Sequence, residues 1–205
     1  MPSLTQAAIL AIGFFLGVAM MGFQMAASRF LTPYFGSGIQ VWASLISTTM
    51  LALMAGYYIG GRVADRRPRS DVLGVAVLIA GGFLALAPFV KDPILNWASM
   101  GIDNLVVGAL IASVAIMVAP LTLMSFFSPF AVRLLLSDAQ HGGRVAGSVY
   151  SITTIGNIVG TLGTSLVLMP MMGSKMITFT FAAVVALCGI GLIVLRAGAA
   201  TDGKR

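Results

Sequence analysis

The chain has 205 residues, of which 59% are hydrophobic and only 9% are charged. Water-soluble domains carry about a quarter of their residues as charged side chains, so this composition excludes a water-soluble protein and indicates one that is solvated by lipid. The net charge of +6 does not indicate nucleic-acid binding, because the basic residues stand at the ends of apolar runs and form no continuous basic stripe.

Apolar segments long enough to cross the hydrocarbon of a bilayer, which takes about 20 helical residues, recur along the whole chain. They cover residues 7–31, 39–60, 72–90, 104–128, 145–169 and 175–196. The connections between them are short, so we expect an all-α integral membrane protein with one six-helix domain over residues 1–205. The first segment is too long for the apolar part of a signal peptide and lacks a basic start, which predicts a retained span.

The placement of lysine and arginine predicts the orientation of the spans. With the spans drawn alternately up and down, nine basic residues fall on one side and three on the other. The larger group is Arg62, Arg66, Arg67, Arg69, Arg133, Arg144, Arg196, Lys204 and Arg205, and the smaller is Arg29, Lys91 and Lys175. Cytoplasmic loops carry the excess, so we expect both termini in the cytoplasm and a multi-pass protein of a bacterial-type inner membrane.

Polar and small residues follow one face of the first segment. Gly13, Gly17, Gln24 and Ser28 recur at helical spacing, and Arg29 comes next in the chain. Two interpretations of Arg29 stay open. Its long side chain extends to the headgroups at the outer surface, or it supplies charge to a cavity that takes an anionic or zwitterionic ligand.

The second, third, fourth and sixth segments differ in composition. The second contains Trp42 and the Tyr57–Tyr58 pair, which we expect to anchor its ends at the membrane interfaces. The fourth contains Pro120, which predicts a kink or a loosened helix, and Ser128–Pro129 near its end. The third and sixth segments are almost wholly apolar, so we expect them at the lipid-facing periphery.

The fifth segment carries a polar stripe within an arc of about 100° on a helix. Its members are Tyr150, Thr153, Thr154, Asn157, Thr161 and Thr164, with glycines at 156, 160 and 163 on a flank. Lipid offers no hydrogen bonds, so such a stripe needs partners or water. It is either a helix-packing face, with Gly156 and Gly160 allowing close approach, or the wall of an aqueous cavity.

No set of catalytic side chains is present. The acidic residues are all aspartates, and none falls inside a predicted span. The chain has one cysteine, Cys188, and one histidine, His141, so neither an intrachain disulfide nor a cysteine-based metal site is expected. We therefore expect no enzymatic activity, no cofactor and no bound metal.

The connection between the second and third segments resembles a motif of the major facilitator superfamily. In that family the motif has the form Gly-x-Leu-Ala-Asp-Arg-x-Gly-Arg-Arg, and residues 61–70 here read GRVADRRPRS. The matching residues are Gly61, Ala64, Asp65, Arg66 and Arg69, whereas Val63, Pro68 and Ser70 depart from the pattern. The resemblance implies that the six segments form one half of a twelve-helix transporter.

A second resemblance is to the membrane part of fused major facilitator/spermidine-synthase-like proteins. Residues 27–38 read ASRFLTPYFGSG, residues 56–62 read GYYIGGR and residues 143–150 read GRVAGSVY. The aminopropyltransferase-like domain of the fused proteins has no counterpart in these 205 residues. In addition, Gln24 stands where the family's first helix is expected to carry a glutamate, which disfavours proton coupling and polyamine binding.

These resemblances imply a half-size secondary transporter that works as a homodimer, because six helices alone do not enclose a two-sided cavity. The expected solute is small, polar and neutral, zwitterionic or anionic. The expected cavity residues are Gln24, Arg29, Tyr150, Thr154, Asn157 and Thr161, and the expected inner-gate residues are Asp65 and Arg66. In the gate, Asp65 would meet the positive N-terminal end of the partner protomer's fifth helix. The alternative is a non-transporting accessory subunit of a larger membrane complex.

Overall fold

A computed structural model of the chain describes residues 4–136 and 142–195. Every regular element in these residues is a helix. Six spans are long and apolar enough to cross a membrane, namely Leu4–Phe35, Ile39–Arg66, Ser70–Gly101, Leu105–Leu135, Gly142–Met171 and Ser174–Leu195. The prediction of an all-α protein with six such spans is confirmed. His141 and the basic residues Arg196, Lys204 and Arg205 lie outside the described residues.

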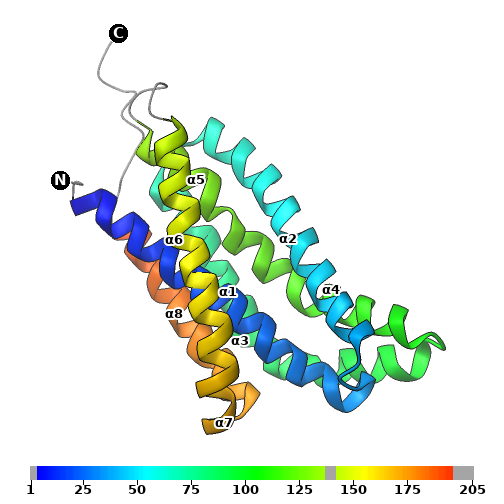
Figure 1. The fold of residues 1–205 in the computed structure, drawn as a ribbon. Helices are drawn as coiled ribbons and strands as arrows, with labels where there is room; N and C mark the ends of the chain where they lie inside the picture. Colours follow the sequence, from blue (N-terminus) through cyan, green and yellow to red (C-terminus); the bar gives the residue numbers. More distant parts are fainter. Residues whose placement is uncertain (1–3, 137–141, 196–205) are drawn as a thin grey trace.

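Two of the six spans are interrupted. The uninterrupted ones are α1 (Leu4–Phe35), α2 (Ile39–Arg66), α3 (Ser70–Gly101) and α8 (Ser174–Leu195). Span 4 consists of α4 (Leu105–Ser125) and α5 (Phe127–Leu135), and span 5 consists of α6 (Gly142–Gly163), the π-helix η2 (Thr164–Leu168) and α7 (Met169–Met171). Figure 1 shows the spans running alternately up and down, with the start of α1 and the end of α8 at the same end.

Spans 1 to 5 are longer than their predicted apolar segments. α2 continues through the arginine cluster to Arg66, so the connection to α3 is only Arg67–Arg69. Arginine favours helices, and its charge complements the negative C-terminal end of α2. α3 likewise continues past Lys91, whose ammonium pairs with Asp92 in the next position. Helix length therefore extends about one to three turns beyond what hydropathy alone indicates.

Proline explains both interruptions. α4 continues through Pro120, and the helix is interrupted at Phe126 instead. Pro129 has no N–H, and its ring conflicts with the carbonyl of Ser125, where α4 ends. In span 5, Pro170 stands in the same relation to Leu166 and lies just beyond the π-helix, in which the Met169 N–H bonds to the Thr164 carbonyl.

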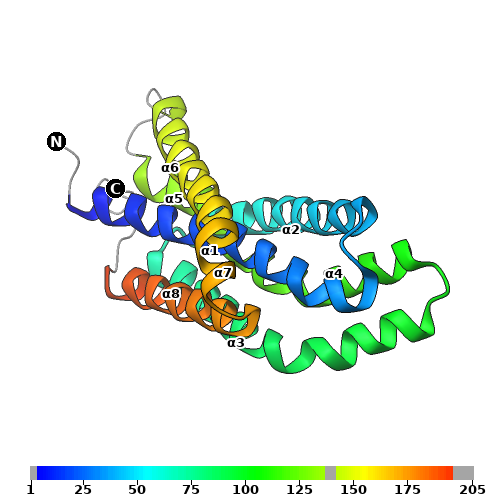
Figure 2. The ribbon, with the colours of Figure 1, turned by 60° about the horizontal axis from the view of Figure 1, so that its bottom comes forward.

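The packing of the spans follows a regular pattern. The most extensive contacts pair span 1 with span 5, span 2 with span 4 and span 3 with span 6, followed by spans 3 with 4 and 1 with 6. Exchanging the first three spans for the last three turns the pair 1–5 into 2–4 and the pair 3–4 into 1–6, and it leaves the pair 3–6 unchanged. Three is an odd number, so the two halves run in opposite directions, which is the arrangement of an inverted repeat. Figure 2 shows α1 between α6 and α8.

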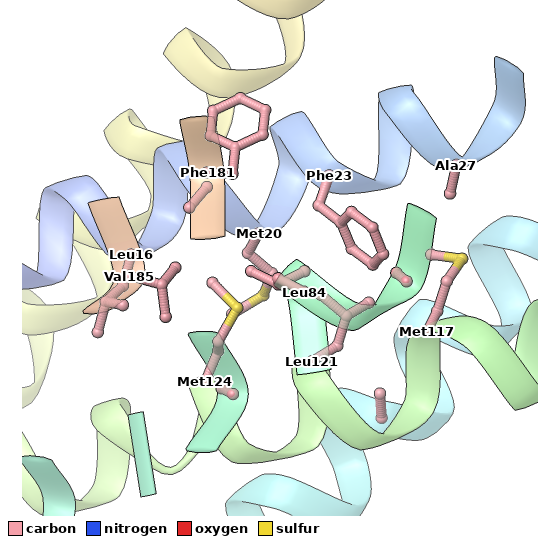
Figure 3. Packing of buried hydrophobic residues seen from close by; sticks show 14 of the residues in the cluster. Leu16, Met20, Phe23, Ala27, Leu84, Met117, Leu121, Met124, Phe181 and Val185 are labelled. Atoms are coloured by element: carbon pink, nitrogen blue, oxygen red, sulfur yellow. The ribbon is translucent and has the colours of Figure 1, made fainter. Parts of the chain in front are cut away.

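The core lies where α1 and α4 meet α3 and α8. Figure 3 shows Leu16, Met20 and Phe23 of α1 facing Leu121 and Met124 of α4, and all of these side chains are buried. α3 and α8 cover the opposite side of α1 and α4 from the site described next. They leave large apolar side chains exposed, as expected of a lipid-facing periphery, including Phe89 and Leu187.

Candidate functional site

Glycines set the distance between α1 and α6. A Cβ at Gly156 would lie 2.2 Å from the Phe14 carbonyl oxygen, and one at Gly160 would lie 2.2 Å from the Val18 carbonyl oxygen. From the other side, a Cβ at Gly17 would lie 2.4 Å from the Thr153 carbonyl oxygen. The two backbones therefore touch, as in other small-residue helix pairs. Of the two interpretations of span 5, helix packing applies to these glycines.

The polar stripe itself does not hold α6 to α1. The Thr153 hydroxyl donates to the Val149 carbonyl at 2.9 Å, and the Thr161 hydroxyl donates to the Asn157 carbonyl at 2.8 Å. Both bonds are internal to α6. Within the described residues, the buried Oδ1 of Asn157 has no hydrogen-bond partner. The stripe thus keeps free hydrogen-bonding capacity, which a ligand or water can use.

A polar hollow lies between α2 and α6, against α1, α4 and α5. We call it the central hollow, and its volume is about 60 Å³, which is room for a few water molecules. Its polar lining consists of Tyr57, Ser128, Tyr150, Thr153, Thr154 and Asn157. Its apolar lining consists of Leu16, Gly17, Met20, Leu53, Met124 and Phe127. Spans 1, 2, 4 and 5 therefore all contribute to it, and spans 3 and 6 do not.

Three of the predicted cavity residues come together in this hollow, namely Tyr150, Thr154 and Asn157. Thr161 is one turn farther along α6 and does not line it. Gln24 is buried between α1 and α2, where the Thr49 hydroxyl lies 3.0 Å from its Oε1. Gln24 thus connects two helices in this structure. Arg29 lies apart from these residues, at the end of the bundle where α1 turns into α2.

Sequence reasoning missed Tyr57 and Ser128 as lining residues. Tyr57 was interpreted as an interface anchor, although Leu53 and Tyr57 are four residues apart and share a helix face, and both line the hollow. That spacing was an available signal. No sequence signal indicates Ser128, because the direction of its side chain depends on the interruption at Phe126, which turns α5 relative to α4.

A second pocket, of about 280 Å³, adjoins the hollow toward the end of the bundle where α1 begins. We call it the terminal pocket. Tyr150 lines both spaces, so its side chain stands between them. Asp65 and Arg133 also line the terminal pocket, with 3.9 Å between Oδ1 and Nε. This ion pair links α2 to α5, and its exposure to solvent keeps it weak.

Of the two predicted gate residues, only Asp65 has an ion-pair partner in another helix within residues 4–136 and 142–195. Arg66 is exposed in the last turn of α2. Arg62 lies instead over the Tyr58 ring, 4.1 Å from its centre, which is a cation–π contact within α2. Arg133 was not predicted as a site residue, because its distance from Asp65 depends on how α5 packs on α2.

Comparison of the chain with protein-family models, with curated proteins and with solved structures finds no match. Within residues 4–136 and 142–195, no three His, Cys, Asp or Glu side chains gather in a group that could hold a metal ion. Function is therefore argued from the geometry of the central hollow and the terminal pocket.

The Gln24–Thr49 contact gives a prediction about stability. Thr49→Val removes the hydroxyl that donates to the buried Oε1 of Gln24, so we expect it to lower the free energy of unfolding by about 1–2 kcal/mol. Gln24→Leu should lower the free energy of unfolding by less, since the Thr49 hydroxyl can still donate to the Leu45 carbonyl at 2.9 Å. The variant that combines Thr49→Val with Gln24→Leu should recover most of the stability that Thr49→Val alone loses. Thermal unfolding in detergent measures all three, and a Thr49→Val protein as stable as the wild type would contradict the expectation.

Proposed function

We propose that the chain is one half of a secondary transporter and that two copies form the working unit. The copies would be related by a two-fold axis along the membrane normal and would move a small polar solute by alternating access. The observation that carries this proposal is the central hollow, which is polar, lies among spans 1, 2, 4 and 5 and adjoins the terminal pocket at Tyr150. In the proposed orientation, both termini are cytoplasmic and the terminal pocket opens to the cytoplasm.

The exposure of span 5 supports a second copy. Within one chain, 17% of its apolar stretch is buried, against 33–44% for the other spans. Several polar side chains on this exposed surface, including Ser151 and Thr154, would otherwise face lipid. A partner that covers α2 and α6 would enlarge the hollow and shield these groups.

The lining of the hollow supports a neutral, zwitterionic or anionic solute. It offers hydroxyls, two tyrosines and an amide, and its described lining includes no carboxylate. A polyamine would bring several positive charges into a site without a counter-charge, which is costly. The free Oδ1 of Asn157 is the group that we assign to the solute.

A second candidate function has one observation in its favour. The hollow of a single chain, about 60 Å³, is too small for most solutes. The exposed face of span 5 would equally accept a different protein, and the chain would then be an accessory subunit of a larger membrane complex. The two candidates differ in the identity of the partner that covers α2 and α6.

Asp65 is the residue that we assign to the inner gate. Its carboxylate is close enough to Arg133 to link α2 with α5, and it is exposed enough to reach a second chain. In a dimer it would also meet the N-terminal end of α6 in the partner, whose partial positive charge favours a carboxylate. Loss of these contacts would favour the state that is open to the cytoplasm.

Uptake into proteoliposomes tests the proposal with a panel of neutral, zwitterionic and anionic small solutes. For any solute that is taken up, Asn157→Leu should reduce uptake about tenfold or more, because a buried hydrogen bond to the solute is lost. The matched control is Val159→Leu, at a position that is exposed on the other side of the same helix. Asp65→Asn should alter uptake without abolishing binding. Uptake by none of the panel, or equal uptake by Asn157→Leu, would contradict the transporter.

A further inference from the structure

Two adjoining pockets lie at the end of the bundle opposite the terminal pocket. One, of about 420 Å³, is bounded by the end of α1, the start of α2 and the π-helix of span 5. The other, of about 470 Å³, is bounded by α7 and the start of α8. Arg29 and Met169 line both. The Arg29 guanidinium therefore stands where the two spaces meet, and we call the combined space the Arg29 pocket.

Arg29 has no counter-charge in the part of the chain that the structure describes. The ion pairs there are Arg69–Asp71, Lys91–Asp92 and Asp65–Arg133, and none of them involves Arg29. Lys91, another cation on this side of the bundle, is held by Asp92, which also accepts a hydrogen bond from the Tyr34 hydroxyl at 3.1 Å. The guanidinium thus keeps its five N–H donors free for a ligand.

The rest of the lining is largely apolar, carries no negative charge and includes a few neutral donors. Ser37, Ser165 and Trp42 line the part of about 420 Å³ beside Arg29. No hydrogen bond of these three side chains occurs within residues 4–136 and 142–195. An arginine fork with neutral donors around it matches a ligand with several acceptor oxygens and a negative charge.

The depth of Arg29 indicates where such a ligand comes from. α1 has 32 residues and is about 48 Å long at 1.5 Å per residue, while the hydrocarbon of a bilayer is about 30 Å thick. About 9 Å of helix therefore extends past the hydrocarbon at each end. Phe35 ends α1, and Arg29 lies about 9 Å before that end, at the border with the headgroups. Both a headgroup and a dissolved anion reach this level.

We propose that the Arg29 pocket is a binding site for a phosphate group, presented by a phospholipid headgroup or by a free phosphate ion. The guanidinium binds two phosphate oxygens side by side, and Ser37, Ser165 and Trp42 donate to the others. The site shares no lining residue with the central hollow, so it does not depend on transport. Lysine at position 29 would keep the charge but lose the paired hydrogen bonds.

Isothermal titration calorimetry of the full-length protein in an uncharged detergent at low salt tests this site. The probes are inorganic phosphate and dihexanoyl phosphatidylglycerol, each added to the wild type, Arg29→Gln, Arg29→Lys and Arg62→Gln. Arg62→Gln is the matched control, because it removes one exposed arginine at the other end of the bundle. We expect saturable binding of at least one probe, weakened about tenfold or more by Arg29→Gln, weakened less by Arg29→Lys and unchanged by Arg62→Gln.

The two probes distinguish the sources. Binding of inorganic phosphate identifies a site for a free anion, and binding of the lipid alone identifies a headgroup site that also needs the acyl chains. Arg29 is exposed, so its variants should unfold at the wild-type temperature, which the same samples verify. The proposal is overturned if neither probe binds saturably to the wild type, or if Arg29→Gln binds both as tightly as Arg62→Gln does.

Discussion

Replacing Gly156 by valine is expected to separate α6 from α1 and to lower the free energy of unfolding by about 3 kcal/mol. Its Cβ would lie 2.2 Å from the Phe14 carbonyl oxygen, which belongs to the backbone and does not move aside as a side chain can. The whole of α6 would have to shift. Thermal unfolding in detergent, followed by the fluorescence of Trp42 and Trp97, measures the loss.

Gly163→Val is the control for this experiment, because it makes the same chemical change about two helical turns farther along span 5. A Cβ at Gly163 meets nothing within 4 Å, and valine is at least as good a helix former as glycine. We expect the Gly163→Val protein to unfold at or slightly above the wild-type temperature. If both variants lost the same stability, the backbone contact between α1 and α6 would not be what positions the polar face of span 5.

A cysteine at position 154 should react with a charged thiol reagent at least about tenfold faster than one at position 159, because thiolates form in water and not in lipid. Thr154 lines the central hollow, whereas Val159, five residues on, is exposed on another face of the same helix. The only native cysteine, Cys188, is buried and is replaced by alanine in the background. Thr154→Cys and Val159→Cys are then compared in sealed membrane vesicles of both orientations.

The side of the membrane from which the reagent is added gives a second expected outcome. Tyr150 lines both the hollow and the terminal pocket, so the reagent should reach Thr154→Cys faster from the side of the terminal pocket. In the proposed orientation this is the cytoplasmic side. Equal and slow labelling of both cysteines would mean that the polar face of span 5 is covered by lipid or protein and lines no aqueous cavity.

The six spans could be predicted from hydropathy, but their ends could not. Hydropathy reports which residues lipid accepts, whereas a helix continues as long as its backbone hydrogen bonds form. α2 therefore includes Arg62 and Arg66, which the apolar segment excluded. The interruption of span 4 depends on which proline conflicts with its neighbours. Pro120 is accommodated within α4, and the interruption precedes Pro129.

The candidate site was predicted in part, for a physical reason. A polar stripe on one helix can be calculated from its period alone, and Tyr150, Thr154 and Asn157 do lie together. The surroundings of Gln24, Tyr57 and Arg133 depend on which helices lie beside them. That Thr49 would meet Gln24, and that Asp65 would approach Arg133, follows only from the packing of span 1 on span 2 and of span 2 on span 4.

Native mass spectrometry of the protein, gently extracted from its own membrane, tests the central proposal most directly. A half-size transporter that works as a homodimer predicts a species at twice the chain mass of 21.3 kDa, with no other polypeptide in it. Gly156→Val should abolish that species, since α6 would no longer be held in place. A species that contains the chain together with unrelated polypeptides, and no homodimer, would contradict the proposal and identify the chain as an accessory subunit.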